Sequence, residues 1–199
     1  LGYCVLGFAA LNAVSTSGSI LQMLNHGVST GALFLLVGVL YDRRHTRAIA
    51  EYGGLATKIP LFAFLFLVFT LSSIALPLTN GFIGEFMILS GSFKAFPVPT
   101  AIAVTGVILG AVYMLTLYMK TMFGEIDESK NGALTDVNST ELAAFVPLLL
   151  MVFWIGVYPQ PFLNLIQPSV DRYLETLKSR EIALNHDTKL FHAPTAVAS

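Results

Sequence analysis

The feature that most constrains this fold is a long apolar run between Lys58 and Lys94. As a straight helix, residues 59–93 would be roughly 50 Å long, whereas the hydrocarbon core of a membrane is about 30 Å thick. The run must therefore break, tilt strongly or fold back. Pro77 indicates where, because proline lacks a backbone donor and clashes with the preceding helical turn.

The residues after Pro77 support a break at this point. Asn80 and Gly81 follow, and both residue types accept backbone conformations that other residues avoid. We predict two half-helices within residues 60–94, separated by an unwound stretch at 76–81. Unwound backbone at membrane depth is tolerated only where it is buried in protein or lines a polar cavity. We therefore expect the break inside a helix bundle, beside a path for ions or water.

Composition supports a membrane protein. Hydrophobic residues make up 55% of the chain and charged residues 12%, against about 25% charged in a soluble domain. The formal net charge of −1 gives no electrostatic reason to bind nucleic acid. Cys4 is the single cysteine, so the sequence offers no disulfide and no metal or redox motif. The fold class predicted is an all-α integral membrane protein, a transmembrane bundle with one broken helix.

The apolar segments place the transmembrane region at 1–166 and a polar tail at 167–199. The first segment is shorter than the roughly 20 residues of a spanning helix and has no initiator Met. We interpret it as the end of a helix that starts upstream. The basic loop after Tyr41 is expected on the cytoplasmic side. The predicted helices are a partial helix at 1–13 and helices at about 17–41, 60–94 (broken at 76–81), 101–123 and 142–158.

Two ionisable side chains fall inside these spans, Glu85 and His26. Every other Asp and Glu, and every Lys and Arg, falls in a loop, the tail or a helix end. Ionisable groups within a membrane are costly and usually mark ion or proton paths. Glu85 is therefore predicted to exchange protons. The alternative is a structural carboxylate near the first turn of the second half-helix, where the helix dipole favours negative charge.

A polar seam extends along the helix that contains His26. Its members recur at steps of three and four residues, so they share one helix face. We expect this face to line a hydrated cavity; the alternative is a seam that only joins neighbouring helices. Tyr113 is a further possible path-lining hydroxyl, or an interhelical hydrogen bonder. The seam consists of Ser15, Ser19, Gln22, His26 and Thr30.

Several motifs resemble one membrane family. The segments "ILQMLNHGVSTGALFLLVG", "YDRRHTR", "YGGLATKIP", "LPLTNGFIGEFMILSGSF" and "YPQP" are similar to the antiporter-like subunits of the proton-pumping NADH-quinone oxidoreductase, respiratory complex I. These subunits have fourteen transmembrane helices with two inverted five-helix repeats, each containing one broken helix. The resemblance implies that this chain covers the second repeat and the C-terminal helices.

The resemblance also implies roles for individual residues. The family's HG histidine matches His26, a central proton carrier, and the glutamate of its GEF motif matches Glu85, the terminal carrier toward the outer side. Sibling subunits generally have Lys at that position, so Glu85 favours the subunit M branch.

The resemblance also implies partners, cofactor use and a cellular location for the chain. The partners would be other membrane subunits of complex I, especially neighbouring antiporter-like subunits, and lipid. No cofactor is expected in this chain, because FMN, iron–sulfur clusters and quinone would be bound by other subunits. The location implied is the bacterial inner membrane, as a multi-pass protein.

Two alternatives to a complex I proton-translocating subunit stay open. A subunit of an Mrp-type Na⁺/H⁺ antiporter or of an energy-converting hydrogenase would share the fold. A purely structural membrane subunit would use Glu85 and His26 only for packing and capping.

Overall fold

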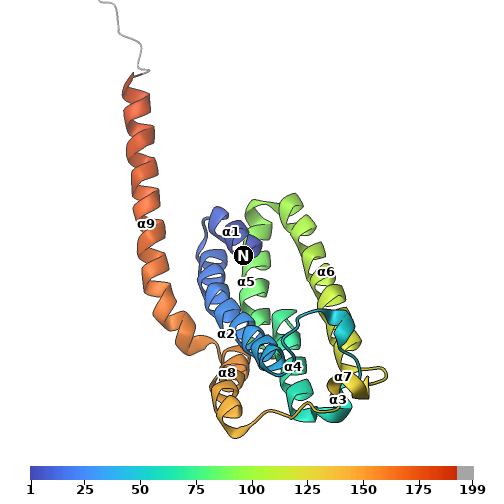
Figure 1. Cartoon of the computed structure of the whole chain (residues 1–199). Coiled ribbons are helices and arrows are strands. Elements are labelled where there is room, and N and C mark those ends of the chain that lie inside the picture. Colours follow the sequence, from blue (N-terminus) through green and yellow to red (C-terminus); the bar gives the residue numbers. More distant parts are fainter. Residues whose placement is uncertain (192–199) are drawn as a thin grey trace, which may run out of the picture.

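The computed structural model describes residues 1–191, and every regular element in that part of the chain is helical. Figure 1 shows a bundle from which one long helix projects. The elements are α1 Gly2–Ala9, α2 Ala13–Arg44, the 3-10 helix η1 Ile49–Glu51, α3 Leu55–Lys58, α4 Pro60–Ser73, α5 Asn80–Ala95, α6 Pro97–Met122, α7 Glu128–Asn131, α8 Ser139–Val157 and α9 Gln160–Phe191.

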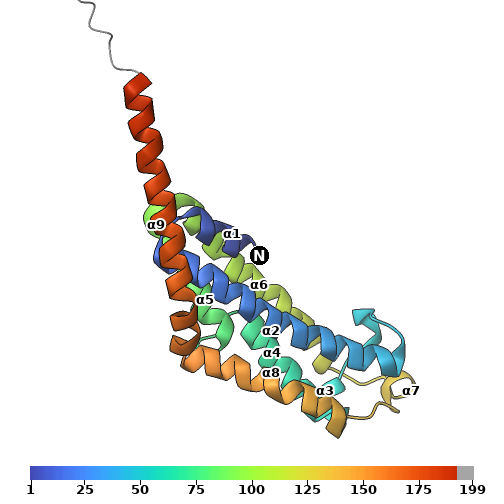
Figure 2. The ribbon, with the colours of Figure 1, turned by 90° about the vertical axis from the view of Figure 1, so that its left-hand side faces the viewer.

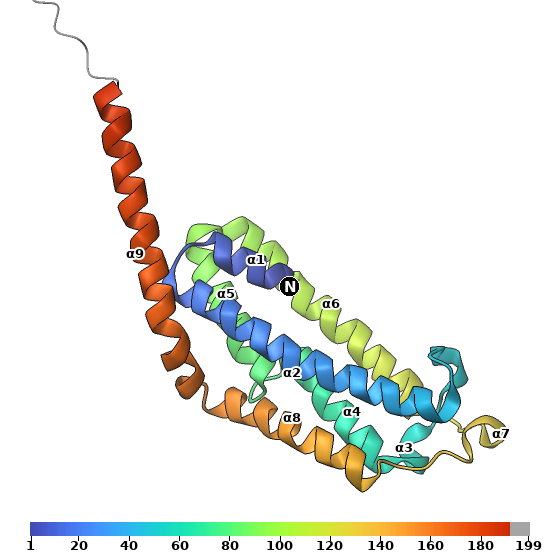
Figure 3. The ribbon, with the colours of Figure 1, turned by 60° about the vertical axis from the view of Figure 1, so that its left-hand side comes forward.

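Three helices are long and apolar enough to cross a membrane by length and composition: α2, α6 and α8. Figures 2 and 3 show them running side by side with α4 and α5, while α9 leaves the bundle at one end. The Asn12 side chain caps the start of α2 by accepting a hydrogen bond from Ser15 N at 3.0 Å. At the far end His45 adopts a left-handed conformation (φ 53°) and closes the helix. The fold class predicted from sequence is confirmed.

The long apolar run is divided into α4 and α5. At 14 and 16 residues, these helices are only about 21 and 24 Å long, so neither crosses the membrane alone. Residues 74–79 between them lie outside any helix, and Pro77 is within this stretch. Ala75 (φ 58°) and Leu78 (φ 76°) both adopt left-handed backbone conformations there. Asn80 and Gly81 belong to the first turn of α5, not to the unwound segment.

Other helix ends differ from the sequence-based boundaries. α2 begins at Ala13, because the Asn12 cap starts it four residues before the predicted residue 17. α6 begins at Pro97, before the predicted residue 101, because a first helical residue needs no backbone donor and tolerates proline. α9 is one helix that crosses the predicted boundary between residues 166 and 167. The predicted tail residues 192–199 lie outside the described part of the chain.

The core lies between α2, α4, α6 and α8. Phe69 of α4 and Phe145 of α8 are both almost fully buried, and their ring centroids are 6.2 Å apart. Phe66 of α4 contacts Tyr118 of α6 with centroids 5.7 Å apart. These aromatic contacts hold α4 in the middle of the bundle and so fix the position of the break at its C-terminal end.

Candidate functional site

Glu85 lies in the second turn of α5, half-buried among the bundle helices. The first turn of α5 contains no acidic residue, and Thr79 at its N-cap makes no side-chain cap. Among the described residues, the hydrogen bond that Glu85 makes comes from Gln22 of α2, whose Nε2 donates to Oε1 at 3.2 Å. Among the described residues, the carboxylate therefore makes no capping hydrogen bond to the half-helix.

A cavity of about 80 Å³ lies beside this carboxylate. Glu85 and His26 both line it, although no hydrogen bond joins the two among the described residues. His26 is exposed, and its Nδ1 is 3.1 Å from Thr30 Oγ1. One water molecule needs roughly 10–15 Å³ of such space, so the cavity accommodates several. The remaining walls come from α1, α2, α4 and α5 and are formed by Leu1, Tyr3, Cys4, Gln22, Asn25, Ser29, Thr30, Ser72, Ser73 and Gly81.

Asn25 and Asn80 join α2 to the start of α5 at this cavity. Asn25 Nδ2 donates to the Asn80 carbonyl oxygen at 2.7 Å, and Asn80 Nδ2 donates back to the Asn25 carbonyl oxygen at 3.2 Å. Both side chains are at most 1% exposed. Because buried amide groups need partners, this reciprocal pair fixes the first turn of α5 against α2.

Two serines extend the contact to α4. Ser29 Oγ of α2 and Ser72 Oγ of α4 are 2.6 Å apart, and Ser72 also donates to Asn80 Oδ1. Gly84 allows the close approach of α5 to α2, since a Cβ at this position would overlap the Gln22 side chain. The polar cluster thus connects α2 with both half-helices, and its members are Gln22, Asn25, Ser29, Ser72, Asn80 and Glu85.

The structure brings some sequence-predicted residues together and separates others. Gln22, His26, Thr30, Gly81 and Glu85 all line the cavity. The remaining predicted residues lie elsewhere, as follows. Ser19 is buried against α1, where its Oγ donates to the Cys4 carbonyl oxygen at 3.1 Å, and Ser15 is buried near the start of α2. Tyr113 of α6 is 64% exposed and lies outside the cavity wall. Pro77 is exposed within the break.

Sequence reasoning missed Asn25, Ser29 and Ser72. A signal for the first two was available, because Gln22, Asn25 and Ser29 are spaced by three and four residues and so share a helix face. The predicted seam instead continues from Gln22 through His26, which lies at the edge of that face. Ser72 gives no comparable pattern, since only the fold brings the end of α4 next to α2.

Among residues 1–191, no three His, Cys, Asp or Glu side chains gather closely enough to hold a metal ion. The groups that line the cavity include one carboxylate, one imidazole, amides and hydroxyls, and these support proton and hydrogen-bond chemistry. Together with three membrane-length helices and a broken one, these features define a multi-pass membrane protein with a polar site at a helix break.

Comparison with known proteins identifies the family. A family model described as NADH:quinone oxidoreductase/Mrp antiporter, transmembrane, matches residues 1–112. The chain therefore belongs to the NADH:quinone oxidoreductase/Mrp antiporter membrane family, and it is an integral membrane protein. The resemblance found in the sequence motifs is confirmed.

Individual relatives agree with this placement. The chain is 44% identical over 174 residues to NADH-quinone oxidoreductase subunit M of Rickettsia prowazekii, and 42% identical over 175 residues to NADH-ubiquinone oxidoreductase chain 4 of Marchantia polymorpha. These matches cover 87% and 88% of this chain but 35% of each relative. The structure is similar to a chain of respiratory complex I from Thermus thermophilus, with a TM-score of 0.80 and 34% identity, covering 87% of this chain and 36% of that one.

Proposed function

We propose that this chain works as part of a proton-translocating, antiporter-like subunit of respiratory complex I, in the bacterial inner membrane. Subunit M and chain 4 relatives and the similarity to a complex I chain support this assignment. Electrons would pass from NADH to quinone through cofactors bound by other subunits. The neighbouring antiporter-like subunits and membrane lipid would be its partners.

The observation that carries the proposal is that Glu85 and His26 line the same cavity. Their elements, α5 and α2, are packed together along their length, and both side chains face space for water. An imidazole changes its charge near neutral pH, and a carboxylate is a common proton donor and acceptor at protein sites. In this proposal His26 and Glu85 change protonation in turn, and water in the cavity carries the proton between them.

The test is Glu85→Gln in the assembled complex, reconstituted into sealed vesicles. Glutamine keeps the shape and still accepts the hydrogen bond from Gln22, but it cannot carry a proton. We expect proton pumping to fall about tenfold or more, with assembly unchanged, since proton-transfer groups typically contribute factors of about 100 or more. Coupled NADH oxidation should fall with it.

The matched control is Glu125→Gln, which removes one carboxylate from an exposed loop outside the cavity. This variant should pump normally. If Glu85→Gln also pumped normally, the chain would act as a structural subunit and the proposal would be wrong.

A second candidate function is Na⁺/H⁺ antiport, because the matching family model also describes Mrp antiporters. Sodium-dependent proton movement in vesicles without NADH oxidation would favour it. Under the leading proposal, proton pumping requires NADH and does not change when sodium is replaced by potassium.

A further inference from the structure

Asn25 lies between the cavity and the helix break. It is 1% exposed, and its Nδ2 donates to the Asn80 carbonyl oxygen at 2.7 Å and to Gln22 Oε1 at 3.2 Å. Turning the amide over would point its oxygen at two acceptor oxygens, so the hydrogen bonds fix its orientation. The two donors of this amide are thereby used within the polar cluster.

The amide oxygen of Asn25 is left without a partner. Among the described residues, Oδ1 is buried and accepts no hydrogen bond. A buried acceptor without a partner is costly, and an ordered water commonly satisfies such a group where a polar cavity has room. Asn25 contributes to the wall of the same 80 Å³ cavity that His26 and Glu85 line.

We propose that Asn25 is a positioning residue for proton transfer in this cavity, with its Nδ2 fixing the helix break through Asn80 and its Oδ1 holding an ordered water between His26 and Glu85. The inference rests on the proposed function and adds a residue to it. Asn25 itself never holds the proton, because its neutral amide is not a base at physiological pH.

The chemistry of this step is a relay through the held water. One hydrogen of the water is donated to Asn25 Oδ1, which leaves an oxygen lone pair and a second hydrogen for neighbouring waters. A proton arriving from the side of His26 bonds to this oxygen as one hydrogen leaves toward Glu85. After the transfer the water again has two hydrogens, and it must turn about its hydrogen bond to Asn25 before it can pass the next proton. Asn25 fixes where the water lies.

The first test needs no variant. A high-resolution structure of the assembled complex should show an ordered water at roughly 2.6–3.2 Å from Asn25 Oδ1, the usual hydrogen-bond range. The inference would be overturned if no water lay within that distance of Oδ1, or if Oδ1 accepted a hydrogen bond from another protein group. This test stands even if every variant failed to assemble.

The second test compares Asn25→Leu with Asn25→Ala in the same complex. Leucine fills the space with an apolar side chain, whereas alanine leaves space that a second water can occupy. Both variants lose the hydrogen bond to the Asn80 carbonyl oxygen, so the difference between them reports the water alone. We expect Asn25→Leu to pump about tenfold less than Asn25→Ala, the effect of one lost hydrogen-bonded step. A purely packing role would give the opposite order, because leucine fills the site better than alanine does.

The matched control is Thr16→Val on the same helix. Thr16 is 2% exposed and its Oγ1 also lacks a partner among the described residues, but it lies outside the cavity wall. Thr16→Val should pump normally. Glu85→Gln is measured in parallel. If Glu85→Gln abolishes pumping and Asn25→Leu does not, the role of Asn25 is refuted while the proposed function stands; normal pumping in Glu85→Gln refutes the proposed function itself.

Discussion

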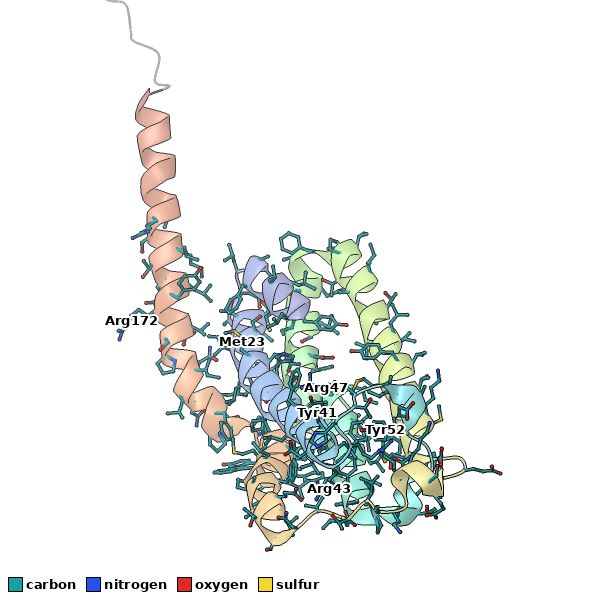
Figure 4. All side chains as sticks on the ribbon, in the orientation of Figure 1. Met23, Tyr41, Arg43, Arg47, Tyr52 and Arg172 are labelled. Atoms are coloured by element: carbon teal, nitrogen blue, oxygen red, sulfur yellow. The ribbon has the colours of Figure 1, made fainter. Side chains whose placement is uncertain are left out.

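At the residue scale, Arg43 connects the end of α2 to α8 and to the loop before it. It lies at the end of α2, and Figure 4 shows it at the end of the bundle where Tyr41, Arg47 and Tyr52 also gather. Its guanidinium contacts Glu141 Oε2 at 2.8 Å, the Asp136 carbonyl oxygen at 3.1 Å and Thr135 Oγ1 at 3.3 Å. Asp136 in turn caps α4 by accepting from the backbone N–H groups of residues 61 and 62 at 2.8 and 2.9 Å.

These contacts predict that Arg43→Lys destabilises the bundle. Lysine presents a single ammonium group and cannot reproduce the planar, branched contacts of arginine. We expect a loss of about 1–3 kcal/mol, since hydrogen bonds that involve a charged group contribute that much. The purified complex should lose this chain at a lower temperature than the unmodified complex does, and that temperature is the measurement.

Arg172→Lys provides the comparison. Arg172 of α9 is exposed and points away from the bundle in Figure 4, and no ion pair is found for it among the described residues. Substitutions of this kind usually change stability by less than about 0.5 kcal/mol. Equal effects of the two substitutions would show that the contacts of Arg43 contribute nothing.

Single residues also show what a sequence reveals about a membrane site. Glu85 and His26 can be selected as candidates from the sequence, because an ionisable group in an apolar run stands out whatever its neighbours are. The spacing of Asn25 from Gln22 and Ser29 is visible in the sequence, but its hydrogen bond to the backbone carbonyl of Asn80, 55 positions away, is not. Only its hydroxyl makes Tyr113 a candidate for the path or for an interhelical hydrogen bond, and the face of α6 on which it lies is set by packing that the sequence does not reveal.

At the element scale, the helix break is held by contacts from α8. Gly156 lies where the backbone of Leu78 and Thr79 passes, and a Cβ at this position would overlap the Leu78 carbonyl oxygen. Leu78 has a left-handed φ of 76°, which is unfavourable for a residue with a side chain. The strained conformation therefore persists because neighbouring elements, α8 among them, hold it.

We expect Gly156→Ala to displace the break from α8. The added methyl group must push either backbone away, and overpacking of this kind typically costs about 1–3 kcal/mol. Proton pumping should fall together with thermal stability, because the same backbone fixes the cavity. The measurements are vesicle pumping and the melting temperature of the complex.

Gly110→Ala on α6 is the matched substitution. A Cβ at Gly110 meets no atom within 4 Å, and alanine is favoured over glycine in a helix by about 1 kcal/mol. This variant should keep its stability and pumping. If Gly156→Ala behaved in the same way, the contact with α8 would not be what holds the break.

Some features of the helix break could be predicted from the sequence, and others could not. Pro77 located the interruption, since its missing donor and ring clash act locally. The left-handed residues Ala75 and Leu78 could not be predicted, because neither residue type favours that conformation. The sequence likewise suggests no link between residue 156 and the break.

At the scale of the whole molecule, two polar loops lie at the same end of the bundle. The first connects α2 to α4, and the second connects α6 to α8. Lys130 of the second loop pairs with Glu51 of the first at 3.1 Å, and Gly54 N donates to the Phe123 carbonyl oxygen at 2.9 Å. The turn between α5 and α6 lies at the opposite end (Figure 3). Because the basic residues after Tyr41 favour the cytoplasm, we predict that both polar loops are cytoplasmic.

This orientation is testable by labelling single cysteines in a Cys4→Ser background. A membrane-impermeant maleimide should label Glu125→Cys in inside-out vesicles and Ala95→Cys in right-side-out vesicles, since both positions are exposed. The opposite pattern would reverse the topology. Labelling of both from one side would mean that α6 does not cross the membrane.

The central claim is that Glu85 gains and loses a proton during turnover, and infrared difference spectroscopy tests it most directly. Spectra of the assembled complex would be recorded with and without NADH, for the unmodified chain and for Glu85→Gln. We predict a carbonyl band of a protonated carboxylic acid that changes on turnover in the first and is missing from the second. Identical difference spectra in the two proteins would contradict the claim, because Glu85 would then keep one protonation state throughout.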